Sequence, residues 1–128
     1  MRIKTLICNC KGLSPSFKSV DMNALPFEVE TDLGVDYAVV NPELCGEQGG
    51  KVMEDVLRSA EDDPDTIVVV AACEAETQQK LFKEVLRNTG FDQDHFVPVD
   101  IRHATNEGII GRLREKIEEL VHSEKEQD

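Results

Sequence analysis

Long apolar runs are missing from this sequence. The longest, Ile67 to Cys73, has the length of a β-strand, whereas a transmembrane helix needs about 20 apolar residues. We also expect no N-terminal signal peptide, because Arg2 and Lys4 interrupt the first apolar residues. We therefore expect a cytoplasmic protein that meets a reducing environment and has no membrane partner.

Positive charge is also scarce. The chain has 14 Lys and Arg residues against 26 Asp and Glu residues, which gives a formal net charge of -12. Proteins that bind nucleic acid neutralise its phosphates with clustered Lys and Arg, so this balance argues against a nucleic-acid partner. An acidic surface instead favours solubility and docking onto a basic protein patch, and adaptation to high salt would produce the same balance.

Internal repeats and low-complexity linkers are not visible. The 128 residues provide for one domain with one core, which we assign to residues 1–122, followed by an acidic polar tail at 123–128. Short β-type runs alternate with amphipathic stretches along this domain. The expected strands are Arg2–Cys8, Tyr37–Val40, Thr66–Ala72 and Phe96–Ile101, and the expected helices are Lys51–Ala60, Glu76–Thr89 and Glu107–His122.

The alternation of strands and helices predicts right-handed βαβ units and a sheet covered on both faces. The third strand (TIVVVAA) is continuously apolar, which is typical of a strand buried on both sides. Pro98 favours an edge position for the fourth strand, and Pro26 is expected to disturb a helix that starts between Asp21 and Leu25. The predicted fold class is a single-domain α/β fold with a four-stranded, mainly parallel sheet in flavodoxin-like order 2-1-3-4.

Four cysteines fall at one edge of this predicted sheet. Cys8 closes the first strand and Cys10 follows it, Cys45 lies in the loop after the second strand, and Cys73 directly follows the third. Because the carboxyl ends of parallel strands share one edge, we expect the four thiols to converge in a crevice there. Four thiolates are a full ligand set for one iron–sulfur cluster or one tetrahedral zinc ion.

The spacing of the cysteines matches neither the C-x2-C-x2-C run of ferredoxins nor a paired zinc ribbon. The residues alone therefore leave four interpretations open: an iron–sulfur cluster, which we favour, a structural zinc site, thiol–disulfide chemistry at Cys8 and Cys10, and inert core cysteines. Zinc is disfavoured because structural zinc ions stabilise domains with little hydrophobic core, whereas this site lies in a functional crevice. Thiol exchange would leave Cys45 and Cys73 without a role.

The loops that carry the cysteines are rich in glycine. These glycines would let the backbone approach a bulky inorganic core closely, and they are Gly12, Gly46, Gly49 and Gly50. The first amides of the helices expected at Lys51 and Glu76 would face the same crevice. Helix N-termini favour negative charge, so they would stabilise thiolates and an anionic cluster.

Around these residues the chain resembles a known family, the N-terminal iron–sulfur domain of heterodisulfide reductase A. A more distant resemblance is to the iron–sulfur subunit of the methyl-viologen-reducing hydrogenase. The matching segments are ICNCKG at 7–12, AVVNPELCGEQGG at 38–50, VVVAACEAETQQKLFKEVLRNTGF at 68–91 and VPVDIRHATNEG at 97–108. The resemblance covers most of the chain and is weakest between Leu13 and Leu33.

What the resemblance implies is an electron-transfer domain with an unusual [4Fe-4S] cluster, preferred over [2Fe-2S], that catalyses no bond chemistry alone. Its redox partner would be a heterodisulfide-reductase-like subunit or a flavoprotein. The implied ligands are Cys8, Cys10, Cys45 and Cys73. The flavin-binding module that normally follows this domain in the family is not matched here, so its chemistry does not carry over.

Two further residues come from the same resemblance. Arg102 and His103 look like the family's arginine-containing turn after the fourth strand. A cationic or hydrogen-bonding side chain beside a cluster offsets its charge and tunes its potential, so both residues are expected to act in this way next to the ligands. The sequence departs from the family at Gly46, where serine is frequent.

Overall fold

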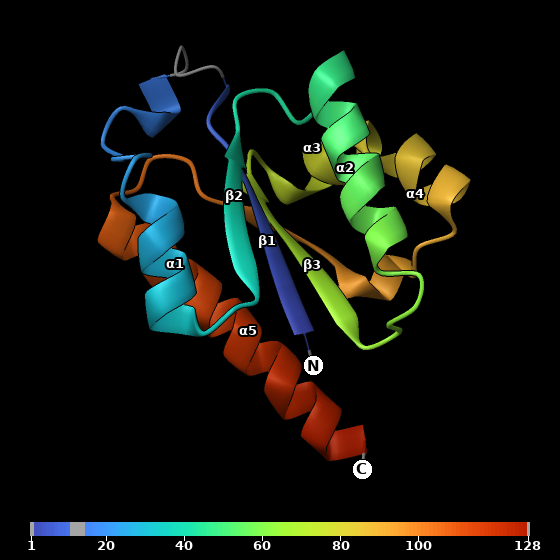
Figure 1. The fold of residues 1–128 in the computed structure, drawn as a ribbon. Coiled ribbons are helices and arrows are strands. Elements are labelled where there is room, and N and C mark those ends of the chain that lie inside the picture. Colours follow the sequence, from blue (N-terminus) through green and yellow to red (C-terminus); the bar gives the residue numbers. More distant parts are fainter. Residues whose placement is uncertain (1, 11–14, 128) are drawn as a thin grey trace.

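The computed structural model describes residues 2–10 and 15–127, with side chains to His122. One four-stranded sheet lies between two layers of helices (Figure 1). The strands are β1 (Arg2–Cys8), β2 (Tyr37–Asn41), β3 (Thr66–Ala72) and β4 (Phe96–Asp100). The helices are α1 (Leu25–Leu33), α2 (Glu47–Ser59), α3 (Ala75–Leu81), α4 (Lys83–Thr89) and α5 (Asn106–Gln127), with 3-10 turns η2 (Pro15–Phe17) and η3 (Gln93–His95). In the described part of the chain, no helix is long and apolar enough to span a membrane.

The strand order is β2-β1-β3-β4 and every strand pair is parallel, which confirms the predicted α/β fold and its 2-1-3-4 order. All residues of β3 are buried, as its continuous apolar run predicts. Pro98 lies on β4, which is an edge strand as predicted. The register places Cys8 opposite Asn41, so β1 and β2 end side by side.

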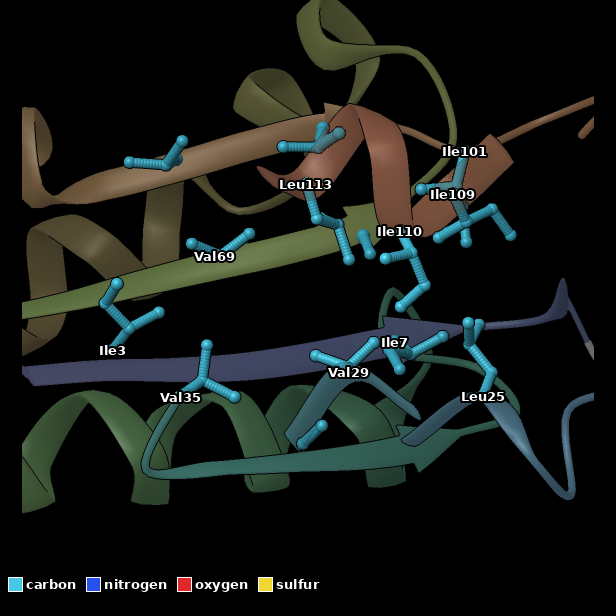
Figure 2. Packing of buried hydrophobic residues seen from close by; sticks show 14 of the residues in the cluster. Ile3, Ile7, Leu25, Val29, Val35, Val69, Ile101, Ile109, Ile110 and Leu113 are labelled. Atoms are coloured by element: carbon cyan, nitrogen blue, oxygen red, sulfur yellow. The ribbon is translucent and has the colours of Figure 1, made fainter. Parts of the chain in front are cut away.

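Successive residues of β3 feed two separate cores, because strand side chains alternate between the faces of a sheet. On one face the sheet packs against α1 and α5, around Val69, Val29 and Ile109 (Figure 2). On the other face Val70 packs with Met53 of α2, in a cluster that includes Phe82, at the junction of α3 with α4, and Leu86 of α4. Burying each such aliphatic side chain contributes roughly 1.5–3 kcal/mol, so the two cores hold both helical layers onto the sheet.

Several element boundaries differ from the predictions. α2 begins at Glu47 and not at Lys51, so Gly49 and Gly50 lie inside the helix. The single helix predicted over Glu76–Thr89 is two helices, because Phe82 leaves helical geometry (φ -103°, ψ 6°) and turns its ring into the core against Phe96, with the ring centroids 5.9 Å apart.

α1, the end of α5 and the end of β4 also differ from the predictions. Pro26 does not disturb α1 but stands in its first turn, where the missing N–H has no partner to lose. α5 continues beyond the predicted end at His122 to Gln127, and β4 ends at Asp100, one residue before Ile101. None of these shifts changes the order or direction of the strands.

Candidate metal centre

The four cysteines lie at or just beyond the carboxyl ends of three neighbouring strands. Cys8 is the last residue of β1, and Cys10 follows it in a left-handed conformation (φ 49°). Cys45 lies in the turn between β2 and α2, and Cys73 directly follows β3. Since β1 lies between β2 and β3, the three cysteine-bearing loops are adjacent at one end of the sheet. We call this end, with its four cysteines, the cysteine edge.

The four thiols range from the core to the surface. Cys8 is 5 % exposed and packs in the core under α2, and its thiol donates a long hydrogen bond to the Pro42 carbonyl oxygen (3.9 Å). That contact links the end of β1 to the turn that carries Cys45. Cys73 is half-buried, whereas Cys10 and Cys45 are exposed. A group held at the cysteine edge would therefore be anchored inside and open to partners outside.

Burial and the charges of neighbouring thiols raise the pKa values of two of the four cysteines. Partial burial raises the pKa of the Cys10 thiol to about 11, together with the charges of Cys8 and Cys73, a hydrogen bond with Cys8 and the charge of Cys45. Burial likewise raises the pKa of Cys73, an effect strengthened by Cys8 and Cys45 and opposed by its own backbone amide and by Arg102. Ionising one thiol is costly beside the others, so a bound cationic group would stabilise the thiolates of this site.

The four thiols limit which metal ion or cluster would suit the site. Thiolates are soft ligands that select iron–sulfur clusters, zinc or Cu(I) over hard cations such as magnesium or calcium. Across residues 2–10 and 15–127, no three His, Cys, Asp or Glu side chains are arranged to hold a metal ion. A zinc ion needs its thiolates at about 2.3 Å from a single point, so these thiols would have to close in on it. An iron–sulfur cluster instead spreads four thiolates around a larger core.

Gly49 fixes the turn that carries Cys45. A Cβ atom at this position would collide with the backbone of Glu43 and Leu44, whereas a Cβ at Gly50 would meet nothing within 4 Å. The turn is further held by the Asn41 side-chain oxygen, which accepts from the Glu43 amide at 2.9 Å. The expectation that Gly49 makes room for an inorganic core is thus corrected, because the space beside it holds the turn itself.

The expectations for Gly46 and Gly12 have different outcomes. The atoms nearest to a Cβ at Gly46 would belong to the flexible Glu43 side chain, the closest at 2.6 Å. Gly46 is also the residue from which α2 starts, so the amides of this helix begin next to Cys45, four residues earlier than the predicted start at Lys51. Gly12 lies outside the described residues.

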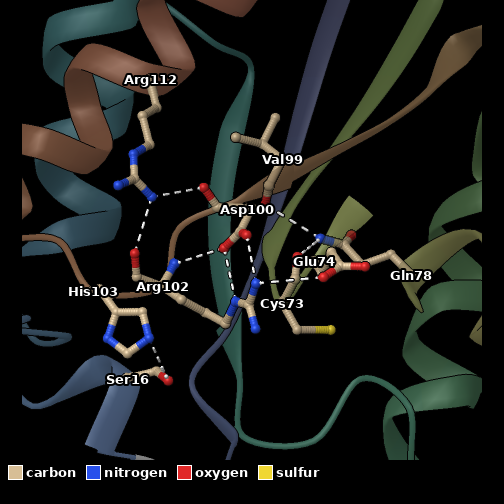
Figure 3. Close-up of polar contacts among 9 residues, drawn as sticks. All are labelled: Ser16, Cys73, Glu74, Gln78, Val99, Asp100, Arg102, His103 and Arg112. Atoms are coloured by element: carbon tan, nitrogen blue, oxygen red, sulfur yellow. Dashed lines mark hydrogen bonds and ion pairs between the residues drawn. The ribbon is translucent and has the colours of Figure 1, made fainter. Parts of the chain in front are cut away.

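Arg102 lies near Cys73 and is oriented by Asp100. The guanidinium donates to both carboxylate oxygens of Asp100, from Nε at 3.0 Å and from Nη2 at 2.8 Å, and Nη2 lies 3.8 Å from Glu74 Oε2 (Figure 3). Arg112 of α5 donates to the backbone carbonyls of Asp100 and Arg102 at 2.9 and 3.0 Å, which fixes the turn after β4. Arg102 therefore acts on the Cys73 thiol from an oriented position, and its charge lowers the thiol pKa.

His103 makes a different set of contacts. Its residue has a left-handed backbone (φ 57°), its amide donates to the Ser16 carbonyl at 2.7 Å, and its Nε2 lies 3.4 Å from Ser16 Oγ. These contacts fasten the turn after β4 to the segment around η2 (Figure 3). His103 therefore links the turn after β4 to η2 beside the cysteine edge.

A groove of about 480 Å³ leads away from Cys45 between α2 and the junction of α3 with α4. Leu44, Phe82 and Val85 contribute its apolar surface, and Leu81 at its side is 49 % exposed. Its charged lining consists of Glu47, Lys51, Glu54 and Glu84. The exposed thiol thus adjoins a hollow with an apolar floor and a charged rim, the composition found at protein contact sites.

Two residues of this region were not predicted. Asp100 could have been recognised from its place at a strand end two residues before Arg102. Gln78 gave no signal, because a glutamine in an amphipathic helix is usually solvated, yet here it is fully buried behind Cys73.

Comparison with known proteins does not identify a family: no family model matches the chain, and no curated protein matches its sequence.

Proposed function

We propose that this chain is a cytoplasmic electron-transfer protein or subunit. It holds one iron–sulfur cluster, [4Fe-4S] in preference to [2Fe-2S], through Cys8, Cys10, Cys45 and Cys73. The observation that carries the proposal is that the loops with all four cysteines of the sequence meet at one sheet edge, where burial and the charges of the neighbouring thiols raise the pKa values of Cys10 and Cys73. When bound, the cluster would take up or release one electron without any bond chemistry on the protein.

The alternatives explain the site less well. Inert cysteines are core residues, but Cys10 and Cys45 are exposed. A thiol–disulfide catalyst needs a thiol whose pKa is lowered, whereas the pKa of Cys10 is raised to about 11. Zinc remains the second candidate because its donor set is the same. The resemblance to heterodisulfide reductase A favours the cluster over zinc.

The chain's own residues would divide the work of holding the cluster. Cys8 anchors it to the core, and the turn locked by Gly49 presents Cys45. Arg102, oriented by Asp100, supplies positive charge beside Cys73 and would offset part of the negative charge of a four-thiolate site. The exposed thiols of Cys10 and Cys45 mark the side from which electrons would enter and leave.

The partner would be a redox protein that reaches the cysteine edge. The resemblance to heterodisulfide reductase A supports a heterodisulfide-reductase-like or flavoprotein partner. The groove beside Cys45 offers an apolar floor for such a contact, and the net charge of -12 would steer a basic surface toward it.

Cysteine variants test this proposal. After anaerobic reconstitution, we expect each single Cys→Ser variant to lose iron, sulfide and the visible absorption of the wild type. Asn88→Ser, in the last turn of α4, should retain all three, because it removes none of the four thiols. A Cys73→Ser variant that keeps a full cluster would show that the ligand set is wrong, and zinc in place of iron would favour the alternative.

A further inference from the structure

The buried amide of Gln78 lies directly behind Cys73. The side chain is 0 % exposed, and its Nε2 donates to the Cys73 carbonyl at 2.6 Å and to the Val99 carbonyl at 3.2 Å (Figure 3). Its Oε1 is also buried and has no hydrogen-bond partner among the described residues. Burying an amide whose oxygen is unpaired costs free energy, so a glutamine here calls for a reason beyond filling space.

A link between β3 and β4 does not explain the buried amide of Gln78. The amide of Ile101 already donates to the Ala72 carbonyl at 3.0 Å, and the ladder pairs Ala72 with Asp100. The two strand ends are therefore linked without Gln78. The shorter of its two hydrogen bonds goes to the residue that carries the thiol, which indicates that the orientation of Cys73 is what the amide controls.

The Gln78 bond also fixes where the next backbone amide points. In a planar trans peptide the C=O and the N–H point in opposite directions, and the described residues contain no cis peptide. The Cys73 carbonyl points to Gln78, so the Glu74 N–H points to the other side. Figure 3 shows the Cys73 sulfur on the side away from this carbonyl. No described hydrogen bond uses the Glu74 N–H, which leaves it able to donate toward a sulfur.

We propose that Gln78 is a positioning residue for the cluster site. It locks the Cys73–Glu74 peptide so that the Glu74 N–H faces the sulfur side. This inference rests on the proposed function, because hydrogen bonds from amides to cluster sulfurs raise the reduction potential. Gln78 would thus tune the potential through Cys73 without touching the cluster. Only a side chain with a long reach and an N–H donor satisfies the Cys73 carbonyl from within the core.

Gln78→Leu removes the donor, and Gln79→Leu, at the exposed neighbouring position of α3, is the matched control. In the metal-free full chain, ¹H–¹⁵N spectra should show that Gln78→Leu shifts the Glu74 amide resonance. The resonance of the Ile101 amide, which is bonded to Ala72, should stay in place. In the reconstituted protein, Gln78→Leu should have a more negative reduction potential than Gln79→Leu at equal iron content.

The outcomes separate this inference from the proposed function. An unmoved Glu74 amide, or equal potentials in the two leucine variants at equal iron content, would overturn the role of Gln78 while the cluster stands. If even the wild type binds no iron, the proposed function fails and the tuning role fails with it, although the amide shifts still report whether Gln78 orients Cys73. If Gln78→Leu does not fold, Gln78→Met, which is unbranched and close in length, takes its place in the same comparison.

Discussion

Replacing Gly49 with alanine should move the turn that carries Cys45. The new Cβ would collide with the backbone of Glu43 and Leu44, and backbone cannot rotate out of the way as a flexible side chain can. Gly50→Ala is the matched control, because it lies one residue further along α2 with nothing within 4 Å of its Cβ. Both changes gain the same helix propensity, up to about 1 kcal/mol.

The difference between the two variants therefore isolates the cost of the collision. Overpacking of this kind costs about 1–3 kcal/mol, so Gly49→Ala should be less stable than Gly50→Ala by that amount. For a domain of this size the gap corresponds to roughly 3–15 °C in Tm. Thermal unfolding of both metal-free variants, followed by circular dichroism, measures it directly.

Cluster retention provides the second half of this prediction. A displaced turn moves Cys45 away from the other thiols, so Gly49→Ala should hold less iron after reconstitution than Gly50→Ala. If the two variants unfold within about 0.5 kcal/mol of each other, which is within the range of ordinary surface changes, the close approach of α2 to the turn is not what fixes Cys45. If the two variants hold equal iron but differ in stability, the packing of this turn stabilises the fold without affecting the cluster site.

Three further predictions concern residues around the site and the core. Asp100→Asn should destabilise the protein by about 0.5–1 kcal/mol at pH 7, because both side chains of the Asp100–Arg102 pair are partly exposed. The hydrogen bond from Arg102 lowers the Asp100 pKa, so the pair's contribution to stability is complete above the ordinary carboxyl pKa of about 3.9 and is lost as the pH falls through the lowered value. Urea unfolding should therefore show the penalty of the Asp100→Asn variant at pH 7 and little of it near pH 2. A pH-independent penalty would contradict this. Arg102→Gln should raise the Cys73 pKa and slow its alkylation in the metal-free protein near neutral pH, as mass spectrometry of the modified chain would reveal; an unchanged rate would remove Arg102 from the site. Leu113→Ala, on the buried face of α5, should cost about 2–5 kcal/mol in urea unfolding, and a cost below about 1 kcal/mol would mean that α5 is not packed on the sheet as described.

The arrangement of the sheet was predictable because it depends on patterns that lie within single segments. The continuous apolar run of β3 and the proline in β4 identified a central and an edge strand, and alternation with helices gave the parallel order. From that order the common edge of the four cysteines followed. The positions of Cys8 and Cys73 relative to their strands were therefore visible in the sequence before any side-chain contact was known.

The features that could not be predicted depend on tertiary contacts. The break at Phe82 arises because the ring packs against Phe96, far away in the sequence. Gly49 was associated with the site, but the atoms that require it belong to a turn whose approach is set by how α2 docks. Gln78 is polar in a helical stretch, and only the packing of α3 behind Cys73 makes it a buried donor. Local patterns contain none of this information.

The central claim is that the cysteine edge holds an iron–sulfur cluster, and the iron and acid-labile sulfide content of the wild-type protein tests it most directly. The measurement requires purification and reconstitution without air, with zinc determined on the same sample. We predict about four irons and four sulfides per chain, in a form that one electron reduces to give an EPR signal. A protein that takes up one zinc and no iron, or no metal at all, would contradict the electron-transfer function.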